Sequence, residues 1–234
     1  MLEILRIALV GGLVGLDTTA AFQVMVSQPL VGGLLAGWAL GEPWLGALVG
    51  LLYQGLFMAE IPVGARTFPD GNQGAVQASA VTAALHSDFG LGTGLSLLLG
   101  FLWSLPMAYA GGRVIVWIRR LHALYLPILD RLVTQDRRAA LNWLYLGVVA
   151  ENFLVSAALT AAAFAAGRGL MGAAGTYLAG FGPWEFWGLT LRGSLLGAGC
   201  GIIFITLLGK ITGKRAWAAL AAAAAAAGLW IAGY

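Results

Sequence analysis

Long apolar stretches recur along this chain and restrict it to folds in which most side chains avoid water. Residues 90–118, 141–166 and 216–233 form three of these stretches, and charged side chains are nearly absent from them. Because 60% of the 234 residues are hydrophobic and the mean hydropathy is +0.86, the apolar surface exceeds what a soluble domain of this length could hide. We therefore expect an all-α polytopic membrane protein, a helical bundle of roughly seven to nine segments.

Several apolar segments in the first half are too short to cross a bilayer. Residues 30–40, 44–59 and 74–85 are each bounded by polar, glycine or proline residues. A hydrocarbon core of about 30 Å requires about 20 residues at 1.5 Å per residue, so these segments are expected to be short or re-entrant. Transporters often build a binding site near the membrane midplane from such broken helices.

The clearest topological signal is a basic segment in the middle of the chain. Residues 119–140 carry five arginines against two aspartates: Arg119, Arg120, Arg131, Arg137 and Arg138 against Asp130 and Asp136. Arginine enrichment is typical of cytoplasmic loops, so we expect a basic cytoplasmic loop here. It would join the approximate halves 1–118 and 141–234 of a single membrane domain, 1–234. Docking of a soluble partner is the alternative use of these arginines.

Glycines spaced four apart occur in both halves of the chain. Gly33, Gly37 and Gly41 form one series, and Gly193, Gly197 and Gly201 form the other. Small residues at this spacing let helices approach closely in lipid. The same glycine spacing in both halves suggests an inverted repeat. Glycine is common in membrane helices, however, so the spacing alone leaves duplication open.

Polar side chains are concentrated in residues 53–79, between apolar segments. They comprise three charged residues and four amides: Glu60, Arg66, Asp70, Gln54, Asn72, Gln73 and Gln77. A polar group in hydrocarbon without a partner costs about 2–7 kcal/mol, so it usually faces a cavity or another polar group. We therefore expect a ligand site in this stretch.

These polar residues also have structural explanations. Asp70 or Asn72 can cap a helix over residues 73–86, on which Gln73 and Gln77 would share one face. Gln54 and Gln77 can form hydrogen bonds between helices instead of contacting a ligand. The sequence alone does not separate these roles.

A second polar pair, Glu151-Asn152, lies inside the apolar segment 141–166. Polar residues at membrane depth commonly pair with one another or line a pathway. The pair could therefore pack against Arg192 or face a pathway.

Metal, redox and hydrolytic chemistry find no support in the sequence. Cys200 is the single cysteine, and His86 and His122 are isolated, so neither a disulfide nor a metal site is expected. HExxH and GxSxG motifs are absent. The excess of positive charge lies mostly in 119–140, which indicates orientation and not nucleic-acid binding. We expect a protein without cofactor that is not itself an enzyme.

The first third of the chain resembles a known family. It contains Leu16-Asp17, Phe22-Gln23 and Ser27-Gln28-Pro29-Leu30-Val31, then a glycine-spaced helix ending at Leu40-Gly41, and later Pro69-Asp70 and Ala78-Ser79. This progression is similar to that of the enzyme IIC component of the mannose/fructose/sorbose-type bacterial phosphotransferase system. The resemblance covers roughly residues 10–85, and the glycine-rich run from Gly188 to Gly197 extends it less specifically.

The resemblance implies a permease subunit for a hexose-like sugar in the bacterial cytoplasmic (inner) membrane. Its implied partners are an enzyme IID-like membrane subunit, with which it forms an elevator-like transporter, and a soluble IIAB subunit that phosphorylates the incoming sugar. It also implies an oligomer. Two other functions stay open: a substrate-capture subunit of another importer, and a membrane scaffold that has lost transport.

Matching positions in the family pattern identify candidate sugar-binding residues. They are Asp17, Gln23, Gln54 and Asp70, with Glu60, Asn72 and Gln73 as a possible supporting layer. Carboxylates and amides suit sugar hydroxyls, which both donate and accept hydrogen bonds. Two positions depart from the pattern: Gln54 stands where many relatives carry glutamate, and Arg192 where a small residue is more usual. The neutral amide of Gln54 can still donate to and accept from sugar hydroxyls.

Overall fold

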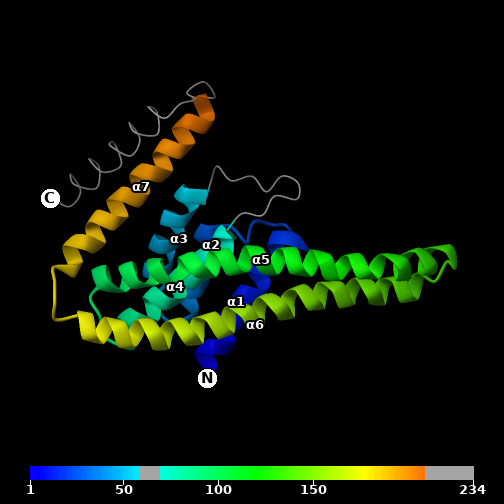
Figure 1. Ribbon diagram of the computed structural model, residues 1–234, viewed down its shortest axis with the longest axis horizontal. Helices are drawn as coiled ribbons and strands as arrows, with labels where there is room; N and C mark the ends of the chain where they lie inside the picture. Colours follow the sequence, from blue (N-terminus) through cyan, green and yellow to red (C-terminus); the bar gives the residue numbers. More distant parts are fainter. Residues whose placement is uncertain (58–68, 209–234) are drawn as a thin grey trace.

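The computed structural model describes residues 1–57 and 69–208, with side chains to residue 197. This part of the chain forms seven helices and no strand (Figure 1): α1 (Leu2–Thr19), α2 (Pro29–Ala39), α3 (Pro43–Phe57), α4 (Gly71–Ser87), α5 (Thr93–Thr134), α6 (Arg138–Leu178) and α7 (Trp184–Leu208). The expected all-α fold is confirmed. Glu60 and Arg66, the basic residues after 209 and the apolar stretch 216–233 lie outside the described residues.

Helices α2 and α3 are as short as their sequences predict. Their 11 and 15 residues would extend only about 17 and 23 Å at 1.5 Å per residue. They form a tight antiparallel pair in which glycine faces glycine: a Cβ on Gly33 would lie 2.7 Å from the Gly50 Cα, and one on Gly37 would lie 2.6 Å from the Gly46 Cα. Gly41 completes the turn with a φ of +85°, a conformation that favours glycine. The glycine spacing therefore builds a close helix pair.

Helix α4 lies at the centre of the bundle. Every residue from Gln73 to Leu85 is buried, and most of them are small. Helices α1, α2, α3, α5 and α6 all pack against it. Because its side chains are small, the surrounding helices approach closely, and the amides of Gln73 and Gln77 are enclosed by protein instead of lipid.

Helices α5 and α6 are the longest elements, and they correct one expectation. They run side by side and extend beyond the other helices (Figure 1). The segment 119–140, expected as a loop, is helical except for a turn at 135–137. Arginine is a good helix former, and helix α5 continues through Pro106 and Pro127. Arg131, Arg137 and Arg138 therefore mark the tip of a helical hairpin, whereas Arg119 and Arg120 lie further back along α5. Helices α5 and α6 are each long and apolar enough to cross a membrane.

An ion-pair network fixes the relative direction of α1, α4 and α6. The Arg168 guanidinium of α6 donates to Glu3 at the start of α1 (2.7 Å) and lies 2.9 Å from the Asp88 carboxylate at the end of α4. At the other ends of these two helices, Asn72 donates to the Thr18 hydroxyl (3.3 Å). Helices α1 and α4 are therefore antiparallel, and the start of α4 lies beside the end of α1.

Candidate functional site

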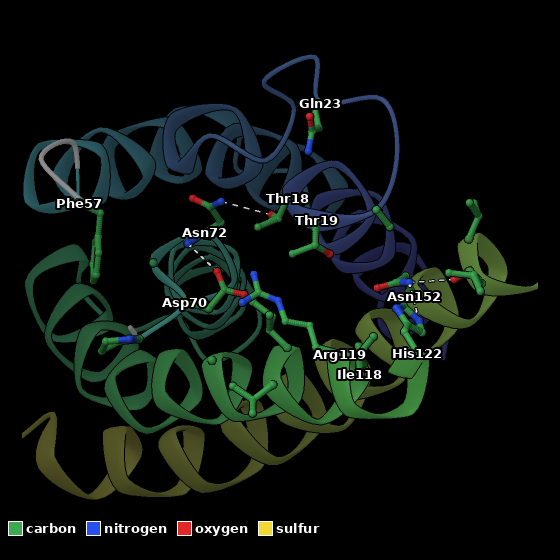
Figure 2. A pocket seen from close by; sticks show the side chains of 18 of the residues that line it. Thr18, Thr19, Gln23, Phe57, Asp70, Asn72, Ile118, Arg119, His122 and Asn152 are labelled. Carbon is green, nitrogen blue, oxygen red and sulfur yellow. Dashed lines mark hydrogen bonds between the residues drawn. The ribbon is translucent and has the colours of Figure 1, made fainter. Parts of the chain in front are cut away.

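A cavity of about 570 Å³ opens where the start of α4 meets the end of α1. This volume lies within the range of roughly 300–1,000 Å³ that is typical of small-molecule sites. Helices α1, α3, α4, α5 and α6 and the α1–α2 loop all contribute to its wall (Figure 2). The polar side chains in the wall are Thr18, Thr19, Gln23, Asp70, Asn72, Arg119, His122, Tyr145 and Asn152.

Asp70 is held in the wall by its role as a helix cap. Its Oδ1 accepts hydrogen bonds from the backbone N–H groups of Asn72 and Gln73, both at 3.1 Å, which confirms the expected cap of α4. Its own backbone N–H donates to the Ala108 carbonyl of α5 at 2.8 Å. In the described part of the chain, Oδ2 accepts no hydrogen bond. Capping thus fixes the carboxylate and leaves one oxygen for a ligand.

The side chains of Asn72, Thr18 and Thr19 lie at the same end of the cavity as Asp70. The Asn72 Nδ2 donates to the Thr18 hydroxyl, which itself donates to the Val14 carbonyl at 2.7 Å. Thr19 follows at the end of α1 and also lines the cavity. Hydroxyl, amide and carboxylate groups therefore converge from two helices on one end of the cavity, as Figure 2 shows. Such a group offers both donors and acceptors to a hydroxyl-rich solute.

Gln73 lies behind this end of the cavity and connects three helices. Its Nε2 donates to the Gly11 carbonyl of α1 (3.0 Å), and its Oε1 accepts from the Thr160 hydroxyl of α6 (3.0 Å). Gln77, one turn further along α4, donates to the Thr160 carbonyl (3.0 Å). The two amides share one face, as predicted, and both hold helices together.

Gln23 reaches the cavity from a loop that Asp17 organises. The Asp17 carboxylate is buried at the end of α1 and accepts from the backbone N–H groups of Val24 (2.7 Å) and Ser27 (2.8 Å). Within this loop Phe22, Gln23 and Met25 have φ values of +69°, +51° and +69°. Non-glycine residues adopt such angles only when surrounding contacts enforce them. Asp17 therefore positions Gln23 and does not itself line the cavity.

We expect Asp17→Ala to loosen the α1–α2 loop. The substitution leaves the buried Ser27 N–H without its acceptor, at a cost of about 1–3 kcal/mol, and removes the contact that holds the left-handed residues. Hydrogen–deuterium exchange in residues 20–28 should rise, while exchange in the centre of α4 should not. Glu42→Ala, at the α2–α3 turn, is the matched control. Unchanged exchange in residues 20–28 of the Asp17 variant would contradict this role.

Gln54 lies outside the lining of the cavity. On α3, its Nε2 donates to the Gln28 Oε1 (2.9 Å), and its Oε1 accepts from the Leu30 N–H (3.3 Å). These bonds join α3 to the start of α2, which is the structural role that a buried or half-buried amide often has. Among the sequence candidates, the structure therefore brings together Gln23, Asp70 and Asn72, and it separates Gln54 from them. Glu60 lies outside the described residues.

The α5–α6 wall contributes residues that were not among the sequence candidates for sugar binding. Arg119 and His122 come from α5, and Tyr145 comes from α6. Asn152 lines the cavity as one of the two expected alternatives for the Glu151-Asn152 pair. Its partner Glu151 accepts a hydrogen bond from the Tyr125 hydroxyl (3.0 Å) between the two helices. The polar pair inside an apolar segment was the one available signal for this wall.

The lining of the cavity combines hydrogen-bonding groups with apolar surface, which decides what kind of ligand it can bind. Among the described residues no group of three or more histidine, cysteine, aspartate or glutamate side chains could hold a metal ion. Phe57 at the end of α3 and Ile118 of α5 supply apolar surface to the same cavity. Apolar surface combined with a few placed hydrogen-bonding groups is the general pattern of small-molecule binding sites.

Comparison with known families agrees with the sequence resemblance. Residues 1–212 match the family model described as the sorbose-specific IIC component of the phosphotransferase system. Individually curated proteins give no match to the chain. The matched region contains every helix that the structure describes and all of the cavity's lining. The chain therefore belongs to the family of sorbose-specific IIC components, the membrane-embedded sugar permease components that work with the other subunits of the phosphotransferase system.

Proposed function

We propose that this protein binds a hexose-like sugar in the cavity between α1, α4, α5 and α6 and moves it across the bacterial cytoplasmic membrane. The observation that carries the proposal is the convergence of Asp70, Asn72 and Thr18 on one end of a cavity of about 570 Å³. A sugar hydroxyl can donate to the free Asp70 oxygen and accept from an amide, so these groups suit an uncharged polyol.

The phosphorylation step belongs, in this proposal, to a soluble IIAB subunit, and an IID-like membrane subunit completes the transporter. Family membership supports this division, because the family is the permease component of a system with several subunits. The arginines at the tip of the α5–α6 hairpin support a cytoplasmic position for that tip. We also propose that the complex is an oligomer that crosses the inner membrane several times.

Co-purification with an IID-like subunit, followed by thermal unfolding with and without sugar, tests this function. A ligand that binds only the folded protein raises its apparent stability by about 2.7 kcal/mol at 100 times the Kd. We expect fructose, mannose or sorbose to raise the melting temperature of the complex. Sugar binding without any IID-like partner would favour a capture subunit of another importer. A stable complex that no sugar stabilises would favour a scaffold.

A further inference from the structure

The α5 wall of the cavity carries a positive charge that a neutral sugar does not require. Arg119 extends into the cavity from α5. In the view of Figure 2 its guanidinium lies on the side of the Asp70–Asn72 end, and His122 and Asn152 form the other end. In the part of the chain that the structure describes, Arg119 forms no ion pair. By contrast, the Arg168 and Arg138 side chains each pair with a carboxylate. Among the described residues, Arg119 is therefore a cation in the cavity wall to which no carboxylate is paired.

A free guanidinium at a cavity wall is suited to an anion with several oxygens. Its planar fork of five N–H donors matches phosphate and carboxylate groups, and such charge-assisted hydrogen bonds are about twice as strong as neutral ones. His122 lines the cavity one turn further along α5, on the same face of the helix as Arg119. The α5 wall therefore presents a guanidinium and an imidazole to the cavity, whereas the start of α4 presents a carboxylate.

His122 lies in the contact between α5 and α6. Its Nε2 lies 3.4 Å from the Asn152 Nδ2 and 3.9 Å from the Glu151 carboxylate, which is outside the cavity lining. The Tyr125 hydroxyl donates to the same Glu151 oxygen, Oε2, so this carboxylate oxygen is already engaged. Asn152 donates to the Val148 carbonyl of its own helix at 2.8 Å. The α5–α6 contact thus holds His122 and Asn152 in place.

We propose that Arg119, with His122 one turn further along α5, binds the phosphate group of a phosphorylated sugar while the sugar's hydroxyls stay near Asp70 and Asn72. The inference rests on the proposed function, since it concerns the product that phosphorylation of a bound sugar creates. One cavity would then hold both forms of the solute. A neutral sugar would depend on the Asp70 end, and a phosphate monoester would depend on both ends.

The test compares neutral and phosphorylated ligands on the full chain in uncharged detergent. Fructose, mannose, sorbose, their phosphate monoesters and inorganic phosphate are titrated while the apparent melting temperature is followed. Arg119→Gln should weaken binding of the phosphate monoester by about 10- to 100-fold, the usual effect of losing a hydrogen bond to a charged group. Binding of the neutral sugar should weaken by a smaller factor than binding of its phosphate ester. Arg119→Lys should have an intermediate effect, because it keeps the charge but loses the fork.

Arg120→Gln is the matched control. Arg120 is the next residue on α5, is exposed, and does not line the cavity, so its substitution removes the same charge from the protein without touching the site. We expect it to leave both affinities unchanged. Equal weakening by the Arg119 and Arg120 variants would overturn the proposal, because the effect would then come from overall charge.

The remaining outcomes separate this inference from the proposed function. A wild-type chain that binds the neutral sugar but not its phosphate ester contradicts the inference alone. A chain that binds the ester but no neutral sugar contradicts the proposed function alone, and a chain that binds neither contradicts both. Adding phosphatidylglycerol tests the other source of a phosphate group. If that lipid stabilises the wild type through Arg119 and the soluble ester does not, Arg119 is a lipid site and the proposal fails.

Discussion

Asp70→Asn is expected to lower sugar binding and uptake by about 10- to 100-fold while the protein still inserts and folds. The substitution keeps an oxygen that can cap α4 through the Asn72 and Gln73 N–H groups, but it removes the charge from the oxygen that faces the cavity. Hydrogen bonds to charged groups contribute about 1.5–3 kcal/mol, which corresponds to this loss of affinity. Uptake in membrane vesicles and the melting temperature of the purified protein measure the two effects separately.

Two further variants distinguish binding from capping. Asp70→Ala removes the cap as well, so it should lower stability by about a further 1 kcal/mol relative to Asp70→Asn. Asp130→Asn removes the same charge from an exposed position of α5 far along the hairpin and should change neither property. If the Asp70→Asn protein takes up sugar at the wild-type rate, then the carboxylate serves only as a helix cap.

Local sequence signals predicted the elements around the site well. Proline at the starts of α2 and α3, glycine spacing along α2, and a capping aspartate before α4 each act over a few residues. The fold class could also be predicted, because the excess of hydrophobic residues is a property of composition alone. Short helices beside polar residues then pointed to the start of α4, which lies in the cavity wall.

The hairpin formed by α5 and α6 could not be predicted from the same signals. The positive-inside rule concerns which side of the membrane a segment occupies, and it does not distinguish a loop from a helix that continues beyond the lipid. Arg119 and Arg120 thus indicate sidedness, while the helical conformation of residues 119–134 depends on packing between α5 and α6 and on the helix propensity of arginine and leucine. The expected loop 119–140 was wrong for this reason.

The lining of the cavity was predicted in part, because its two walls come from different kinds of sequence. Asp70 and Asn72 lie near each other in the sequence, and together with Gln23 they stand out as polar residues between apolar segments. Arg119, His122 and Tyr145 meet them only through the tertiary fold, and their sequence surroundings are those of an interfacial basic segment. Gln54 has an amide that could bind a sugar hydroxyl, but it forms hydrogen bonds with Gln28 and Leu30 and so joins α3 to the start of α2. Spacing along the chain predicts neither the α5–α6 residues in the cavity wall nor the position of Gln54 outside it.

The close approach of α2 and α3 leads to the largest expected loss of stability. Gly33→Ala would place a Cβ 2.7 Å from the Gly50 Cα and 2.8 Å from the Gly46 carbonyl oxygen. Both are backbone atoms, so the helices must separate instead of a side chain turning aside. Overpacking of this kind typically costs about 1–3 kcal/mol, and the cost is expected to be at the upper end because two helix backbones must move.

Gly169→Ala on α6 provides the opposite case with the same chemical change. No atom lies within 4 Å of the added Cβ, and alanine stabilises a helix interior by about 0.5–1 kcal/mol relative to glycine. Thermal unfolding in detergent should therefore show a lower melting temperature for Gly33→Ala and an equal or higher one for Gly169→Ala. Because α3 ends at Phe57 in the cavity wall, separation of α2 from α3 should also weaken sugar binding. Equal stability of the two variants would mean that the glycines of α2 are not required for close packing.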